Sequence, residues 1–206
     1  MNANQFLTSK IKKWHNKNRR GTSRGQSMVE LAITLPFLLI LFLGTAEVAY
    51  YMFAANTVNN TAREAARRAI RESRYDTITI SQWADIVGAR LDQSASSSFL
   101  QPTSVTDTAF VTHFRSDNAG NLISCETAPV IWPADNAAGT DSSQISCALL
   151  AEKTANMATT LGTVLSDDDF IVVEYYHHHT PIIGLTIVSP NGVTIYSSSI
   201  MRIIGQ

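Results

Sequence analysis

The sequence lacks the short motifs that mark many enzyme active sites. It contains no glycine-rich phosphate-binding loop, no Gly-x-Ser-x-Gly, no His-Glu-x-x-His and no cysteine–histidine pair at a useful spacing. Phosphate binding, serine hydrolysis, zinc-dependent proteolysis and cysteine-dependent hydrolysis each depend on one of these arrangements. We therefore expect a protein that is not an enzyme and that has no cofactor.

Cysteine is scarce, with only Cys125 and Cys147 among 206 residues. In an oxidising compartment such a pair predicts a disulfide, and closing a loop of this length would stabilise the fold by about 3 kcal/mol. The alternative is a pair of unbridged, buried thiols.

Charged residues are missing from a long apolar run. No charge occurs from Leu31 to Ala46, and only Glu47 interrupts the apolar pattern before Ala55. About 20 apolar residues at 1.5 Å each span a hydrocarbon core of about 30 Å. The sequence therefore predicts one membrane-spanning helix. Pro36 lies inside it and lacks an amide hydrogen, so the helix should loosen or kink just before this residue.

Acidic residues are absent from the first 25 residues, which carry seven basic ones. Lysine and arginine beside a membrane span remain on the cytoplasmic side, so we expect the N-terminus inside and the chain after Phe53 outside. Both cysteines then lie on the oxidising side. The remaining residues include nine basic and 17 acidic side chains, a formal charge of −8. This acidic balance argues against nucleic acid as a partner.

A cleaved secretory signal peptide is the alternative to a permanent anchor. The small residues Gly44, Thr45 and Ala46 could precede such a cut. Three features favour the anchor instead: the basic leader is long, Glu30 stands at the start of the apolar run, and the run continues to Phe53.

The helical pattern continues beyond the apolar run. From Asn56 to Ile70 there is no glycine or proline, and alanines recur at helical spacing on one side. Arginines mark another side, as either a solvated face or a strip for a partner. The resulting prediction is one continuous helix from about Ser27 to Arg71, about 65–70 Å long at 1.5 Å per residue.

A second helix is predicted after a capping box formed by Thr79 and Gln82. Its apolar stripe of Trp83, Val87 and Leu91 should pack against a sheet or against the long helix.

The rest of the chain predicts strands and one further helix. A surface loop carrying Trp132 is expected over 126–143, followed by a third helix from about Ser143 to Leu161. The fold class is therefore α+β, a long N-terminal helix that continues into a domain with an antiparallel sheet and one or two packed helices. The predicted strands cover 108–114, 122–125, 170–177, 185–188 and 193–204.

Two polar runs could bind a metal ion. Alternate side chains of a strand face opposite ways, so only His177 and His179 share a face, and no third ligand is placed beside them. The run Asp167–Asp169 lacks the spacing and the closing glutamate of an EF-hand. We therefore expect no metal site, with the histidines as polar strand-end residues and the aspartates in a solvated turn.

The start of the apolar run carries a more specific pattern. Gly25 is followed by Gln-Ser-Met-Val-Glu, then by Leu-Ala-Ile-Thr-Leu-Pro-Phe-Leu-Leu-Ile-Leu-Phe-Leu-Gly and, after Thr-Ala, by Glu47. This stretch resembles the opening of TadE/TadG-like proteins, which are minor pilins or pseudopilins of the tight-adherence (Flp) pilus, a branch of the type IV pilus superfamily. The strong resemblance covers residues 24–70. Residues 170–204 are more weakly similar to the closing strands of the family.

The resemblance implies processing by a membrane aspartyl peptidase, the prepilin peptidase, which would cut between Gly25 and Gln26. Glu30 would then guide processing and assembly. A carboxylate inside lipid is costly, and the new α-ammonium of Gln26 would give Glu30 a cationic partner. The alternative is that Glu30 simply lies at the lipid headgroups. Glu47 and Pro36 would add a second charge and a bendable point to the same segment.

The resemblance also implies a structural or assembly subunit of a Flp-type pilus or a related secretion machine, in the cytoplasmic membrane or in the pilus at the cell surface. Its partners would be other pilin-like subunits, the assembly machinery, the prepilin peptidase and membrane lipid. The alternative is an uncleaved single-span protein whose exterior domain binds a ligand, a surface polymer or a partner protein. The expected parts are a cytoplasmic leader (1–25), a transmembrane and exterior helix (26–74) and an exterior α+β domain (75–206).

Overall fold

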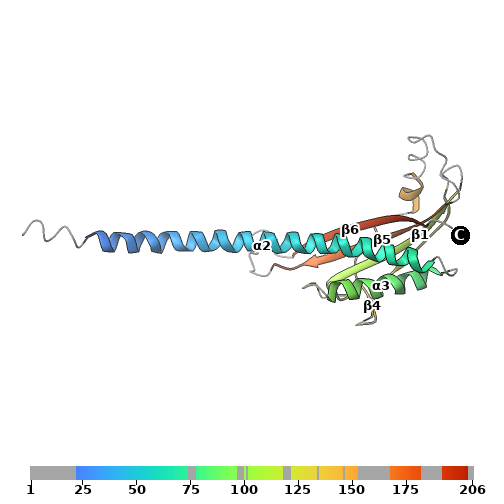
Figure 1. Ribbon diagram of the computed structural model, residues 1–206, viewed down its shortest axis with the longest axis horizontal. Coiled ribbons are helices and arrows are strands. Elements are labelled where there is room, and N and C mark those ends of the chain that lie inside the picture. The colour runs from blue at the N-terminus through green and yellow to red at the C-terminus, as the bar shows by residue number, and fades with distance from the viewer. Residues whose placement is uncertain are drawn as a thin grey trace, which may run out of the picture. The chain divides into compact units, whose positions relative to one another are not determined.

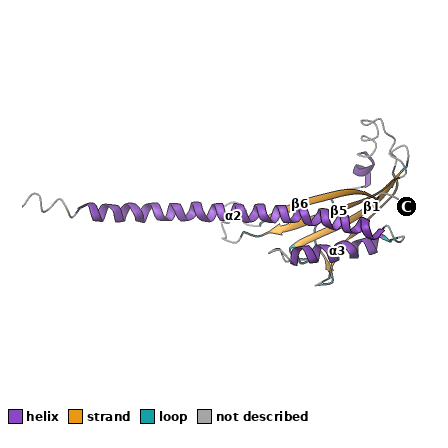
Figure 2. Cartoon of the chain, in the orientation of Figure 1, coloured by secondary structure: helices purple, strands orange, loops and turns teal. Residues whose placement is uncertain are grey.

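A computed structural model describes residues 22–73, 78–96, 100, 102–117, 122–133, 135–145, 147–152, 168–181 and 192–203. It contains a long helix α2 (Thr22–Ser73), a second helix α3 (Ile80–Ser96) and an antiparallel sheet, so the α+β fold class is confirmed (Figures 1 and 2). Most of the basic leader lies outside the described residues. The chain divides into two compact units, Met1–Val48 and Ala49–Gln206.

Helix α2 is slightly longer than predicted and extends past both Ser27 and Arg71. In the second unit, five alanines and one valine at helical spacing form its buried side. They have the small side chains that allow a helix backbone to lie close to a sheet. The fully buried residues are Ala54, Val58, Ala62, Ala65, Ala66 and Ala69.

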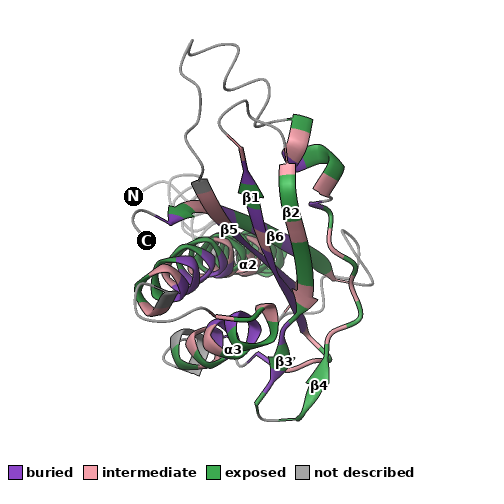
Figure 3. Cartoon of the chain, turned by 90° about the vertical axis from the view of Figure 1, so that its right-hand side faces the viewer, coloured by how far each residue is buried: buried purple, intermediate pink, exposed green. Residues whose placement is uncertain are grey.

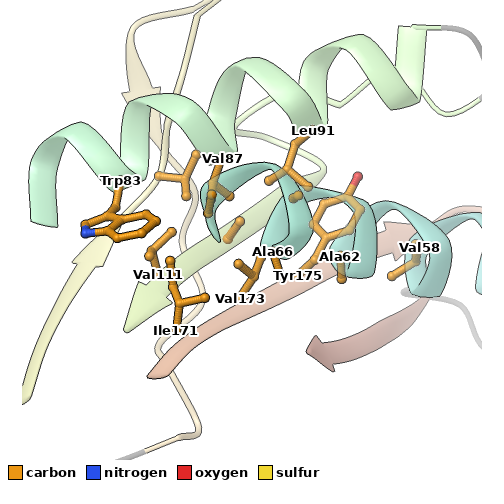
Figure 4. Close-up of a cluster of buried hydrophobic side chains, with 14 of the residues drawn as sticks. Val58, Ala62, Ala66, Trp83, Val87, Leu91, Val111, Ile171, Val173 and Tyr175 are labelled. Atoms are coloured by element: carbon orange, nitrogen blue, oxygen red, sulfur yellow. The ribbon is translucent and has the colours of Figure 1, made fainter. Parts of the chain in front are cut away.

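Helix α3 begins as predicted. The Thr79 backbone N–H donates to Gln82 Oε1 at 2.8 Å, and the Gln82 N–H donates to Thr79 Oγ1 at 3.4 Å. These reciprocal hydrogen bonds are those of a capping box. The predicted stripe is also confirmed, since Trp83, Val87 and Leu91 are buried in the core shared with α2 and the sheet (Figure 4).

Four strands form the main sheet in the order β2-β1-β5-β6, and every neighbouring pair is antiparallel. Three of them extend beyond the predicted strands, because backbone pairing continues through polar side chains where the apolar pattern stops. The predicted strand at 185–188 lies outside the described residues. The strands are β1 (Asp107–Ser116), β2 (Leu122–Pro129), β3 (Ile131–Trp132), β4 (Ala137–Ala138), β5 (Asp168–His179) and β6 (Val193–Ile203).

The predicted surface loop over 126–143 is wrong in its first part. Strand β2 continues to Pro129, and β3 and β4 then pair as a small hairpin. Trp132 is 1% exposed and donates from Nε1 to the backbone oxygen of Asp107 at 3.1 Å. The indole is buried because its large apolar surface packs in the core while its only donor reaches a buried acceptor.

The third helix begins later than predicted. Residues 143–145 are not helical, whereas 147–152 are. Two residues of the non-helical stretch hydrogen-bond to Glu174 of β5 instead of entering a helix. The predicted end at Leu161 lies outside the described residues.

Both faces of the sheet have chain packed on them, but the β6 side chains on the second face are exposed (Figure 3). One face packs on α2 and α3, where Val111, Ile171, Val173 and Tyr175 are buried (Figure 4). The other face is crossed by residues 139–145 and 147–152, which we call the strap.

The strap lies close against the sheet. Its Ile145 and Leu150 pack with Phe114 of β1 and Val172 of β5 in a second apolar cluster. At its start, a Cβ on Gly139 would clash with the hydroxyl oxygen of Thr108, the β1 threonine beneath it. Only glycine therefore fits at this close approach.

Candidate functional site

The predicted processing residues lie in the first turns of α2. Gly25, Gln26 and Glu30 are helical and exposed. Gln26 and Glu30 are four residues apart, so their side chains lie on the same side of the helix. A Cβ on Gly25 would meet no atom within 4 Å. Since glycine inside a helix costs about 1 kcal/mol relative to alanine, the fold gives no reason for a glycine at this position.

The apolar run that follows is exposed on every side of the helix. Between Met28 and Phe42 the large apolar side chains are 50–76% exposed. An 18-residue window within Gly25–Glu72 has a mean hydropathy of 2.1, and none of it is buried. Among the described residues this is the one helix long and apolar enough to cross a membrane. A helix that is apolar all round requires lipid or other helices around it.

Helix α2 continues through Pro36 without a break. Proline has no N–H to donate to the carbonyl four residues earlier. Just before it, Thr34 Oγ1 donates to the backbone oxygens of Glu30 at 2.9 Å and of Leu31 at 3.3 Å. Such contacts slightly destabilise helices and often bend them. The helix is therefore weakest around Thr34 and Pro36.

Glu47 lies about 25 Å beyond Glu30 along the helix axis, so the fold does not bring these two carboxylates together. Glu47 is half-buried. One turn later, the rings of Tyr50 and Tyr51 lie with their centroids 5.0 and 5.6 Å from that of His179. Tyrosine is typical of the membrane–water interface, and these two residues hold the end of β5 against α2 near the end of the apolar run.

Part of this helix matches a known protein family. Residues 25–67 match the model of a family described as TadE-like protein. The segment is TadE-like. The resemblance found in the sequence is therefore confirmed from Gly25 to the first turns of α2 beyond the apolar run. No curated protein and no solved structure matches the chain.

The TadE-like family is a structural, pilus-associated family. The match and the apolar helix together indicate a Tad pilus-associated protein with an N-terminal membrane helix. The match ends at residue 67 and does not reach the strands near the C-terminus.

Beyond the TadE-like segment, the sheet holds a buried polar cluster around Glu174. This residue is 0% exposed, and its carboxylate accepts hydrogen bonds from Ser143 Oγ, from the Gln144 N–H at 3.0 Å, from Tyr176 OH at 3.0 Å and from Tyr196 OH at 3.2 Å. All four neighbours are donors, as suits an ionised carboxylate, which can only accept. Burial, followed by the charge of Glu174, raises the pKa of Tyr176, so its hydroxyl stays protonated. The cluster attaches the strap to the sheet.

A second buried carboxylate, Asp107, lies on the helix-facing side of the sheet. It is 0% exposed, accepts from Tyr175 OH at 2.7 Å and lies 2.6 Å from His177 Nδ1. Burial, followed by the charge of Asp107, raises the pKa of Tyr175. The residue therefore joins the start of β1 to the end of β5.

The three consecutive histidines do not share one site. His177 contacts Asp107, His178 Nε2 lies 2.9 Å from Asp141 Oδ2 on the strap, and His179 packs on the tyrosine rings of α2. Within the described part of the chain, no group of three histidine, cysteine, aspartate or glutamate side chains is placed to hold a metal ion.

The expected solvated turn at the aspartates is wrong where the structure describes it. Asp168 and Asp169 are the first residues of β5. Asp169 Oδ1 lies 3.8 Å from Arg115 Nε on the neighbouring strand, so a cross-strand cation stabilises an acid at a strand end. Asp167 lies outside the described residues.

Neither buried carboxylate is among the site residues predicted from the sequence. For Glu174 there was a signal, because it follows Ile171, Val172 and Val173 inside an otherwise apolar strand. A charged group in such a strand needs hydrogen-bond partners if the strand is buried. For Asp107 there was none, since an acid at the start of a strand is ordinarily solvated.

The structure joins Cys125 of β2 to Cys147 of the strap in a disulfide, with the Cα atoms 5.9 Å apart. Losing a bridge across 22 residues should cost about 3 kcal/mol. We expect the double variant Cys125→Ser, Cys147→Ser to melt about 10 °C below the parent.

Non-reducing peptide mapping of the parent should recover the two cysteine peptides linked. Full alkylation of both thiols without prior reduction would contradict this prediction.

Proposed function

We propose that the chain is a minor pilin-like structural or assembly subunit of a Flp (Tad) pilus or of a related secretion machine. The observation that carries this proposal is the family match, which starts at Gly25 and covers the exposed apolar helix. An apolar surface of this size needs lipid or neighbouring helices to cover it. Lipid covers it before assembly, and the helices of other pilin-like subunits cover it in the assembled pilus.

In this proposal the chain crosses the cytoplasmic membrane once, with its N-terminus inside and the sheet-bearing domain outside. The seven basic residues of the leader support this orientation. The disulfide supports it as well, because disulfides persist in oxidising compartments outside the cytoplasm. Both observations support a position of this domain outside the cytoplasm.

The proposal includes a cut by the prepilin peptidase between Gly25 and Gln26. Three observations support it: the leader contains no acid, the family match begins at Gly25, and the fold gives no reason for glycine there. We expect the protein extracted from membranes to begin at Gln26, as determined by N-terminal sequencing and intact mass. A mature chain that still carries residues 1–25 would contradict the cut and favour the uncleaved, ligand-binding alternative.

A matched pair of variants separates recognition of the cut site from damage to the helix. Gly25 and Gly44 are both helical, and a Cβ on either would meet no atom within 4 Å. Gly25→Leu should therefore leave the helix intact and retain the leader. Gly44→Leu, which enlarges the same helix elsewhere, should be cut like the parent. Equal processing of the two variants would argue against a specific cut after Gly25.

A further inference from the structure

The two edges of the main sheet, β2 and β6, run in opposite directions. This follows because the sheet has four strands in the order β2-β1-β5-β6 and each neighbouring pair is antiparallel. Two copies in the same orientation, placed side by side, therefore bring β6 of one next to β2 of the other as antiparallel neighbours. An antiparallel β6–β6 pairing about a twofold axis would instead point the two α2 helices in opposite directions.

The flank of the domain beside β6 is basic. Ser197 Oγ of β6 donates to Asn59 Oδ1 of α2 at 2.7 Å, which places this side of α2 next to β6. Arg63 and Arg67 follow one and two turns later on the exposed side, and the Arg67 side chain is 68% exposed. Strand β6 contains no acidic residue. We call β6 with Arg63 and Arg67 the basic flank.

One carboxylate nearby does not neutralise this flank. Glu64 lies 4.0 Å from Arg67, but it also lies 3.3 Å from Arg71 and 3.3 Å from Arg90 of α3. Three guanidinium groups thus share a single carboxylate. Arg63 adds a further positive charge on the same stretch of helix.

The flank beside β2 is acidic. Asp85 of α3, Glu126 of β2 and Asp135 of the β3–β4 hairpin are all exposed. The Ser104 hydroxyl, which donates to Asp135 Oδ2 at 2.6 Å, lowers the pKa of that carboxyl, so it remains charged. No lysine or arginine occurs between residues 122 and 138. We call α3, β2 and the hairpin with these three acids the acidic flank.

The one arginine of α3 does not neutralise the negative charge of the acidic flank. Arg90 is turned toward the long helix, where its Nη2 contacts Glu64 Oε1. Trp83 on the same helix stacks over His113, the β1 residue paired with Glu126. Glu126 therefore lies on the α3 side of the sheet, where Asp85 adds to the same negative surface.

We propose that copies of this chain associate side by side, with the basic flank of one copy against the acidic flank of the next and all α2 helices in the same direction. The contact is heterologous, because each copy uses a different surface for each neighbour, so the association propagates into a row, a ring or a helical filament. Opposite charges orient the encounter and disfavour the reversed arrangement. The shared direction of the helices rests on the membrane anchoring in the proposed function, whereas the charges of the flanks do not.

The test uses two reversed forms of the full-length chain. The first carries Arg63→Glu with Arg67→Glu and so has two acidic flanks. The second carries Asp85→Lys with Glu126→Lys and so has two basic flanks. Two differently tagged copies are co-expressed, the membranes are extracted in mild detergent, and recovery of one tag with the other is measured. We expect recovery about tenfold below the parent when either form is paired with itself, because like charges then meet.

Mixing the two reversed forms provides the decisive outcome. Each interface in the mixture again joins a basic flank to an acidic one, so recovery should return to the parental value. Parental recovery of either form with itself, or no rescue in the mixture, would overturn the proposal. The charge-reversed control Glu152→Lys, on an exposed strap residue outside both flanks, should behave like the parent.

Two further measurements separate a loss of pairing from unfolding of the variants and from an effect of processing. All substituted side chains are exposed, so the variants should melt close to the parent, which thermal unfolding checks. The pairing experiment is repeated with the uncut Gly25→Leu chain, because the flanks do not depend on processing. Charge-dependent pairing of this uncut chain would support the inference whatever the N-terminus of the parent proves to be, and the proposed cut is tested separately by that N-terminus.

Discussion

Replacing Glu174 with alanine is expected to lower the free energy of unfolding by about 3 kcal/mol or more. The carboxylate is fully buried and accepts from two strap groups and two tyrosine hydroxyls. Its removal takes the acceptor from the buried Tyr176 hydroxyl and leaves the Ser143 hydroxyl and the Gln144 N–H only longer contacts, to Ile145 O at 3.4 Å and Tyr176 OH at 3.2 Å. The cost is about 1–3 kcal/mol for each donor that water cannot reach. For a domain of this size, the melting temperature should fall by about 10 °C.

Two companion variants identify the cause of that loss. Glu174→Gln keeps the shape but replaces one acceptor oxygen by a donor that faces other donors, so it should also destabilise, though less than alanine. Glu152→Ala removes an exposed carboxylate from the strap itself and should change stability by no more than about 0.5 kcal/mol. Thermal unfolding followed by circular dichroism measures all three.

Hydrogen exchange locates the effect within the molecule. Because Glu174 binds Ser143 and Gln144, its loss should release the strap, and amides around residues 139–145 should lose protection before those of the central strands. A Glu174→Ala variant that melts within 2 °C of the parent, or whose strap stays protected, would contradict the anchoring role of this carboxylate.

Replacing Glu30 with alanine is expected to leave membrane insertion intact, or improve it, while impairing assembly. After a cut behind Gly25, Gln26 carries an α-ammonium four residues before Glu30 on the same side of the helix. At about 4 Å and an effective dielectric near 20, this ammonium and the carboxylate attract by about 4 kcal/mol. Desolvation offsets much of this attraction. The pair can form within one subunit or between neighbours.

In the proposed function, the charge pair would also set the register between neighbouring helices. From Met28 to Phe42 the helix surface is apolar on every side, so two such helices can slide past one another at little cost. A carboxylate and an ammonium in this surface match at one offset only. Glu30→Gln keeps the shape and removes the charge, so it should fail in assembly as Glu30→Ala does.

The assembly experiment needs a matched acid in the same helix as its control. Glu47 lies about 25 Å away along the axis, out of reach of an ammonium at Gln26 on its own chain. We expect Glu30→Ala and Glu30→Gln to be recovered poorly with the pilus or its machinery, and Glu47→Gln to be recovered better than either. N-terminal sequencing of each variant separates an assembly defect from a processing defect. Normal recovery of both Glu30 variants would reduce Glu30 to an interfacial carboxylate and remove the main physical support for the pilin function.

The helices of this protein could be predicted because their signals are local. The apolar run after Gly25 needs only consecutive residues to be recognised, and the family match covers the same stretch. The capping box at Thr79 depends on residues three positions apart, and the structure has both of its hydrogen bonds. The stripe of α3 follows from helical periodicity alone.

The errors and omissions lie where contacts join distant parts of the chain. Trp132 donates to a residue 25 positions earlier, Gln144 to one 30 positions later, and Tyr175 to one 68 positions earlier. No pattern within one segment predicts such a pairing.

The two charged flanks of the domain also depend on contacts between distant parts of the chain. Arg63, Asp85 and Glu126 are evident in the sequence, but each looks like an ordinary solvated residue. Strand order places β2 and β6 at opposite edges, and helix packing places α2 beside one edge and α3 beside the other. Short-range periodicity is enough to predict a helix and its apolar side. Which charges share a surface depends on how strands far apart in the chain pair, and only the folded sheet establishes that.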